Sequence, residues 1–182
     1  MYRVDVPDWR MPCASRSRNG FSLFELMLVV CVVGVAAVFF FDRILFYQEM
    51  AERTAVDITV MHLRNGVRYR TAELMLHQKD REIVDMEGKN AMRWIEYPPP
   101  GYIGELSHPQ SDQIAPGSWY FDIDKGELVY LVRRGRHFVS ATNDRKVLRY
   151  RVVASVKRST LNPSVTLAEG MVLNSLEKYT WF

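Results

Sequence analysis

The sequence predicts an α+β protein in which one long N-terminal α-helix packs against a C-terminal antiparallel β-sheet. An unbroken apolar run covers residues 26–41, a helical pattern without proline continues to residue 79, and strand-like alternation marks residues 118–182. With 182 residues, 48% of them hydrophobic, the chain is long enough for one globular domain and an appendage.

The composition argues against several classes of function. The net charge of +3 is too small to indicate a nucleic-acid-binding chain by itself. The two cysteines, Cys13 and Cys31, both precede the predicted domain, which must therefore fold without a disulfide. The histidines are scattered without metal-ligand spacing, and no nucleophile or phosphate-loop motif is present. We therefore expect no enzyme, no metal site and no cofactor.

Residues 21–41 form a segment that can cross a bilayer. At about 1.5 Å per residue they cover about 30 Å, which is the thickness of the hydrocarbon core. The preceding residues carry more arginine than acid, and Arg16 and Arg18 lie just before the span. This asymmetry predicts a cytoplasmic N-terminus, with the rest of the chain outside the cytoplasm.

A cleaved secretory signal peptide and an uncleaved signal anchor are alternative interpretations of this segment. Ala36 and Ala37 offer a poor cleavage site, because aromatic residues follow them. Neither alternative explains Glu25, a carboxylate near the start of the span that is costly to insert and needs a partner.

Residues 20–26, GFSLFEL, followed by the apolar run, resemble the prepilin cleavage and methylation motif of type IV pilins and type II secretion pseudopilins. The resemblance implies that residues 1–20 are a leader, and that a prepilin peptidase cuts between Gly20 and Phe21 and methylates the new amino group of Phe21. It also implies that Glu25 pairs with the Phe21 ammonium of a neighbouring subunit and so sets subunit registry. Gly34 would allow close helix packing in the filament core.

The same resemblance implies a location and a set of partners. The chain would pass once through the bacterial inner membrane, place its C-terminal domain in the periplasm, and later join a pilus or pseudopilus. Its partners would be the prepilin peptidase, other pilin or pseudopilin subunits and the inner-membrane assembly platform. Met11 is an alternative start to Met1 and would leave a ten-residue leader. The resemblance leaves open whether the chain serves a pilus or a secretion machine, and whether it is a major or a minor subunit.

Residues 42–79 are predicted to continue the helix and to pack on the domain. Apolar residues at helical spacing mark one face, and they are Val56, Val60, Leu63, Val67 and Leu74. An exposed coiled coil is the alternative interpretation of this segment, although its apolar residues do not keep a regular heptad repeat. Gly66 is the predicted weak point of this helix.

Residues 80–117 are predicted to be a Pro-rich connecting region without regular structure, because Pro98, Pro99, Pro100 and Gly101 interrupt it. A short capped turn is expected at residues 90–94, with Trp94 against the long helix.

Residues 118–182 are predicted to form the antiparallel sheet region. Residues 119–123 and 127–132 flank a turn at residues 124–126, where Gly126 supplies positive φ, and this pattern predicts a β-hairpin. Residues 146–156 should form a third strand, and residues 170–173 or 179–182 a fourth.

Two further features are candidate sites. Asp122, Asp124 and Glu127 resemble part of a calcium loop, but their spacing fails the EF-hand pattern and a plain turn is favoured. Residues 133–158 hold nine basic residues against one acid, so Arg149 and Arg151 could contact nucleic acid. A solvated sheet face is the simpler interpretation.

The sequence therefore favours a structural filament subunit that acts by polymerisation. The alternatives are a DNA-binding minor pilin that uses the basic C-terminal strands, and a membrane-anchored periplasmic binding protein.

Overall fold

The computed structural model describes residues 22–110, 112–140, 146–158 and 166–182. The predicted leader and the predicted cleavage bond between Gly20 and Phe21 lie outside these residues. The chain divides into two compact units, residues 1–43 and 44–182.

One helix, α1 (Leu23–Leu76), forms the N-terminal part of the described chain. It is 54 residues long and contains no proline, which agrees with the long helix expected from the sequence. Its residues up to Arg43 belong to the first unit, and its residues from Ile44 belong to the second.

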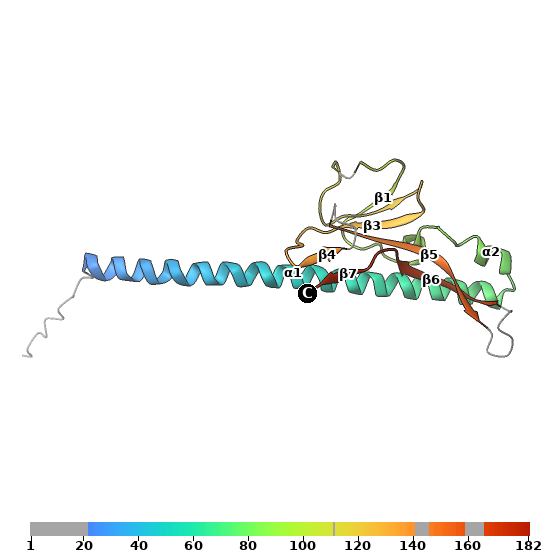
Figure 1. The fold of residues 1–182 in the computed structure, drawn as a ribbon, viewed down its shortest axis with the longest axis horizontal. Helices are drawn as coiled ribbons and strands as arrows, with labels where there is room; N and C mark the ends of the chain where they lie inside the picture. The colour runs from blue at the N-terminus through green and yellow to red at the C-terminus, as the bar shows by residue number, and fades with distance from the viewer. Residues whose placement is uncertain (1–21, 111, 141–145, 159–165) are drawn as a thin grey trace, which may run out of the picture. The chain divides into compact units, whose positions relative to one another are not determined.

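Within the second unit, α1 packs along the sheet (Figure 1). The predicted apolar stripe is confirmed, because all five of its residues are at most 5% exposed, with Leu63 and Val67 at 0%. The stripe joins a core that includes Tyr150, Val152 and Leu173 from the sheet. Since this face is covered by the chain's own sheet, it is not available for a coiled coil.

The main sheet has five strands in the order β1-β2-β3-β5-β6. The strands are β1 (Tyr102–Leu106), β2 (Trp119–Asp122), β3 (Glu127–Leu131), β5 (Val147–Arg158) and β6 (Thr166–Ser175). The predicted hairpin is confirmed as β2 and β3, which pair antiparallel across a turn where Gly126 has φ of 63°. Pairing of β3 with β5 and of β5 with β6 is also antiparallel, so the predicted third and fourth strands are present.

The expectation of a wholly antiparallel sheet is wrong at β1, which runs parallel to β2. Because the two strands are parallel, the chain must return to the same end of the sheet between Leu106 and Trp119. The sheet is therefore mixed.

The expectation that residues 80–117 lack regular structure is also wrong. Besides β1 they contain α2 (Asp80–Val84) and the 3-10 helix η1 (Ala91–Trp94). The short turn expected at residues 90–94 is present, because the Asn90 side chain caps η1 by accepting the Met92 N–H at 3.0 Å.

Gly66 is a packing site in α1, which is unbroken at this position. A Cβ atom on Gly66 would lie 2.6 Å from the backbone oxygen of Trp94, so only glycine lets η1 approach the helix this closely. Trp94 is half-buried and packs against the core, as the sequence predicts.

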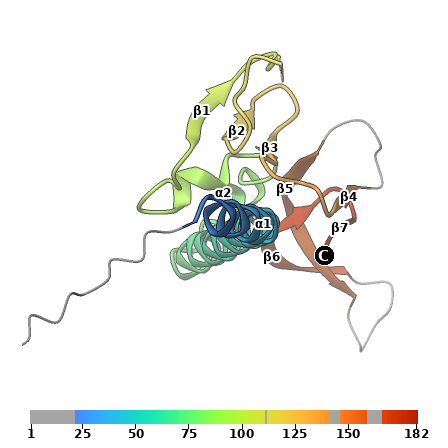
Figure 2. The ribbon, with the colours of Figure 1, turned by 90° about the vertical axis from the view of Figure 1, so that its left-hand side faces the viewer.

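A second, two-stranded sheet pairs β4 (Phe138–Ser140) with β7 (Tyr179–Trp181) in antiparallel fashion. Figure 2, which looks along α1, shows the strands curving around one side of the helix within the domain. The opposite face of the main sheet carries a smaller apolar cluster of Tyr120, Val129 and Leu131. The alternation of inward and outward residues along β2 and β3 accounts for these two clusters.

Candidate functional site

The described part of the first unit is a largely apolar helical segment with exposed side chains. It contains an 18-residue stretch with a mean hydropathy of 2.7, and none of this stretch is buried. The exposed fractions of Phe39, Phe40 and Phe41 are 71%, 70% and 68%. The helix is long and apolar enough to cross a membrane, and such exposed apolar surface requires lipid or other helices around it.

Glu25 lies in the first turn of α1 and is exposed. The backbone N–H of Glu25 donates to Ser22 Oγ at 3.2 Å, and the N–H of Leu26 donates to the Ser22 carbonyl oxygen at 3.1 Å. Ser22 is therefore the N-cap, and Glu25 occupies the third helical position, as in a capping box. A carboxylate at this position also interacts favourably with the helix dipole.

The cap gives Glu25 a local role beside the intersubunit role that the motif implies. The signal for it, Ser followed three residues later by Glu, is readable in the sequence. Glu25 is the one charged residue in residues 23–41, so its carboxylate has no cationic side chain within that stretch.

Gly34 has open space around it, because a Cβ there would meet nothing within 4 Å. Cys31 is likewise exposed and has a free thiol. The structure of the single chain therefore leaves the Gly34 side of the helix uncovered, and its predicted packing role concerns other subunits.

Two carboxylates of α1, which the sequence analysis missed, hold the domain to the helix. Glu49 is 2% exposed, and it accepts the His137 N–H at 2.9 Å and the Trp181 indole N–H at 3.2 Å. His137 Nδ1 lies 2.9 Å from the other Glu49 oxygen. Burial, the largest single influence, raises the pKa of Glu49, but these hydrogen bonds and the charge of His137 outweigh it and hold the pKa below 4.5.

Glu52, one turn further along the helix, binds the loop after β3. Its Oε1 accepts the Arg133 N–H at 2.6 Å and the Tyr130 hydroxyl at 2.9 Å, and its Oε2 accepts the Arg134 N–H at 2.8 Å. Glu49 and Glu52 thus satisfy three backbone N–H groups of one loop.

An aromatic group completes this contact. The Phe46 ring lies edge-on to Phe182, with ring centroids 5.3 Å apart, and His137 stacks on Phe182 at 4.9 Å. The C-terminal residues are therefore packed against the part of α1 where the domain begins.

The acidic residues of the hairpin turn do not converge on a common point. Asp122 Oδ1 accepts the N–H groups of Asp124 and Lys125, both at 3.1 Å, which closes the turn. Asp124 Oδ2 pairs with His108 at 2.7 Å, and Glu127 pairs with Arg151 at 2.9 Å. Within the described residues, no group of three His, Cys, Asp or Glu side chains could hold a metal ion.

The two arginines proposed as nucleic-acid contacts are both ion-paired within the domain. Arg149 Nη2 lies 2.6 Å from Glu177 Oε1. Arg151 Nη2 lies 2.9 Å from Glu127 Oε1 and donates to the Lys125 carbonyl oxygen at 2.7 Å. Their guanidinium groups therefore have acidic partners on the chain itself.

No family model, curated protein or solved structure matches this chain.

Proposed function

We propose that this chain is a prepilin-type structural subunit. After removal of residues 1–20 it is held in the bacterial inner membrane by the apolar half of α1, and it then assembles through that helix into a type IV pilus-like or type II secretion filament. The mechanism is polymerisation, and no catalytic step is assigned to the chain. Its partners are a prepilin peptidase, other subunits of the filament and an inner-membrane assembly platform.

One observation carries the proposal. A single carboxylate, Glu25, stands in the first turn of a helical segment that is otherwise apolar and has no buried residue in its apolar stretch, five residues after Gly20. A charge in this position is expensive in lipid unless a cation reaches it. A free amino group at Phe21 of a neighbouring subunit would supply that cation, and close packing of helices would cover the apolar surface.

The capping role of Glu25 must be separated from its role in assembly. In the bacterium that makes the chain, Glu25→Gln removes the charge and keeps a polar side chain at the third helical position, whereas Ser22→Ala removes the cap and keeps the charge. We expect Glu25→Gln to be inserted and processed normally but to yield few sheared filaments. We expect Ser22→Ala to yield filaments close to wild type.

Wild-type filament yield from Glu25→Gln would contradict the registry role. If Ser22→Ala lost its filaments while Glu25→Gln kept them, the role of Glu25 would be limited to stabilising the start of the helix.

The nucleic-acid alternative is less well supported than the filament proposal. Phosphate binding by Arg149 and Arg151 would have to break their ion pairs with Glu177 and Glu127, and the side chains of these acids are only 16% and 10% exposed. The membrane-anchored binding-protein alternative predicts that Glu25 can be replaced without consequence.

A further inference from the structure

The outer face of α1 within the second unit carries a row of residues without charge. Each lies two positions along the chain from a residue of the buried apolar stripe, which is about 200° around the helix, so the row points away from the core. The residues of this outer row are all exposed, and they are Ile58, Met61, Asn65, Tyr69, Ala72 and Leu76. The charged residues of the same stretch all lie off the row, and they are Arg64, Arg68, Arg70 and Glu73.

The outer row has the character of a helix–helix contact rather than of a solvated surface. The solvent-facing side of a helix normally carries charged and polar side chains. Here Ile58 is 46% exposed, Tyr69 is 75% exposed and Leu76 is 83% exposed. The row continues without a charge, at the same spacing of three and four residues, back to Tyr47, so it is about 44 Å long. Uncharged residues at this spacing form the surface that one helix presents to another.

The outer row repeats every eleven residues. Its first three residues are followed at this interval by its last three. Eleven residues make about three turns of helix, so the row stays close to one line along the helix. Asn65 stands where the two repeats meet. A single Asn in an apolar helix seam pairs with the same residue of an identical helix and fixes the register, which favours a second copy of this chain as the partner.

The charges beside the outer row are complementary to those of a second copy. Asp57 and Arg68 lie on one flank, each one position before a residue of the row, and His62 and Glu73 lie on the other flank, each one position after. In two parallel helices, a side chain on one flank meets the side chain five positions later on the opposite flank of the other helix. Asp57 therefore meets His62 of the second copy, and Arg68 meets Glu73 of the second copy. Two-fold symmetry makes each contact twice.

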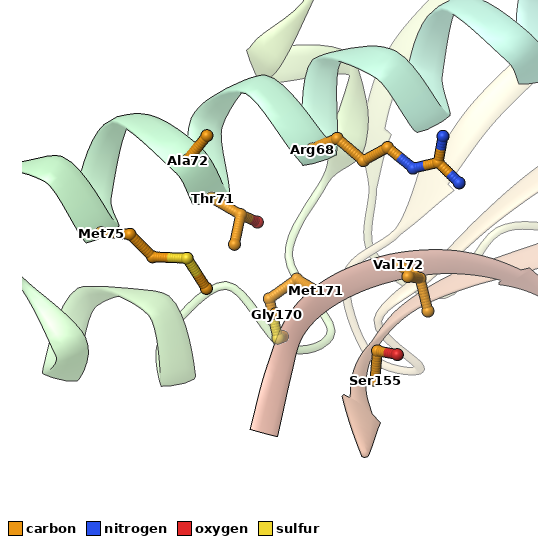
Figure 3. A pocket seen from close by; sticks show the side chains of 8 residues that line it. All are labelled: Arg68, Thr71, Ala72, Met75, Ser155, Gly170, Met171 and Val172. Atoms are coloured by element: carbon orange, nitrogen blue, oxygen red, sulfur yellow. The ribbon is translucent and has the colours of Figure 1, made fainter. Parts of the chain in front are cut away.

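The side chains of Arg68 and Glu73 are accessible to a second copy. Arg68 borders an open pocket of about 420 Å³ between α1 and β6, and its side chain extends away from Gly170 and Met171 (Figure 3). Within the part of the chain that the structure describes, Arg68 forms no ion pair. Glu73 pairs with Arg70 at 2.8 Å, and its side chain is still 41% exposed.

We propose that the outer row of α1 binds the outer row of a second copy of this chain, as a parallel pair of helices. An antiparallel pair would instead bring the same flank of both copies together, so that Arg64 and Arg68 would face the same arginines. The contact is about 44 Å long and about 10 Å wide, roughly 440 Å² per copy, which is less than the approximately 800 Å² per partner of a stable complex. The pair is therefore weak. This inference goes beyond the proposed function, because it requires neither cleavage nor filament formation.

The test measures disulfide cross-linking of the full chain in membranes of a host without a prepilin peptidase, after Cys13 and Cys31 are replaced by Ser. In a parallel pair each residue of the row meets its own counterpart, and a disulfide requires such close approach. Ala72→Cys should therefore cross-link several-fold more than Ala55→Cys. Ala55 is the matched control, because it is also an exposed alanine of α1 but lies off the row.

Charge reversal tests whether the partner is a second copy. Arg68→Glu and Glu73→Arg should each lower the cross-linking of Ala72→Cys several-fold, since like charges then meet across the pair. When two differently tagged chains, one with each reversal, are expressed together, opposite charges meet again at both contacts. Cross-linking between the two tags should then return to the level of the unreversed chain.

Equal cross-linking of Ala72→Cys and Ala55→Cys would overturn the inference and would leave the row to lipid or to a different protein. A loss in the single reversals that the mixed chains do not restore would also overturn it. Thermal unfolding of each variant checks that the reversals leave the domain folded. Because the host has no peptidase, a failure of processing leaves these results unchanged, and alkaline extraction reports separately on the membrane insertion that the proposed function requires.

Discussion

Both oxygens of the Glu49 carboxylate bind His137, one through its backbone N–H at 2.9 Å and the other through its ring Nδ1 at 2.9 Å. These two residues are 88 positions apart in the chain, and Glu49 is almost completely buried. The contact ties α1 to the loop before β4, beside the C-terminal residue Phe182.

Replacing Glu49 with Ala should therefore destabilise the domain. The change leaves the His137 N–H and the Trp181 indole N–H without their acceptor, and a loss of about 2–4 kcal/mol in the free energy of unfolding is expected. Denaturation of the full chain in detergent, followed by tryptophan fluorescence, measures it. Asp57→Ala, which removes an exposed partner of Arg53, should cost less than about 1 kcal/mol, and equal losses from both variants would refute this role for Glu49.

The same carboxylate predicts a pH dependence of stability. Because the pKa of Glu49 in the folded domain is below 4.5, its contribution is present above about pH 4.5 and is lost as the pH falls through the folded-state pKa. Glu105 has a lowered pKa for a similar reason, chiefly the hydrogen bond from Arg93. Unfolding free energies measured between about pH 6 and pH 3 should fall steeply for the wild type and less steeply for Glu49→Gln. Identical slopes would show that Glu49 does not contribute.

Two glycines of α1 should respond to alanine in opposite ways. Gly66→Ala places a methyl group 2.6 Å from the Trp94 backbone oxygen, so η1 must move and about 1–3 kcal/mol of stability should be lost. Gly34→Ala meets nothing in the single chain and should leave its unfolding unchanged. If Gly34 packs against other subunits, that same variant should lower filament yield. Thermal unfolding and filament shearing separate the two effects, and a stable Gly66→Ala variant would contradict the close approach of η1.

The apolar stripe of α1 and the hairpin of β2 and β3 could be predicted because each is a local pattern. Helical spacing without proline predicts the first, and alternation around a glycine turn predicts the second. The parallel pairing of β1 could not be predicted, since it depends on how the chain returns between β1 and β2. Glu49 and Glu52 look like ordinary surface carboxylates in a helix, and their N–H partners lie more than eighty residues away.

The candidate site also has a part that the sequence predicts and a part that only the fold brings together. The sequence alone provides the motif at Gly20, Phe21 and Glu25, and it also contains the Ser22 cap signal. The ion pairs of Arg149 and Arg151 could not be predicted, because Glu177 and Glu127 reach them only through the fold.

Arg151→Ala should affect stability rather than nucleic-acid binding. It leaves Glu127 nearly buried without its cation, and a loss of about 1–2 kcal/mol is expected after allowing for the partial exposure of Arg151. Arg81→Ala is the control, since Arg81 is exposed in α2. A salt-dependent loss of DNA affinity in Arg151→Ala, with unchanged stability, would instead favour the nucleic-acid interpretation.

Prepilin processing is best measured by the intact mass and N-terminal sequence of the membrane-extracted chain, expressed with and without a prepilin peptidase. A chain that begins at methylated Phe21 only when the peptidase is present is the predicted result. A chain that still begins at Met1 or Met11, or one cut near Ala37, would contradict the assignment as a prepilin.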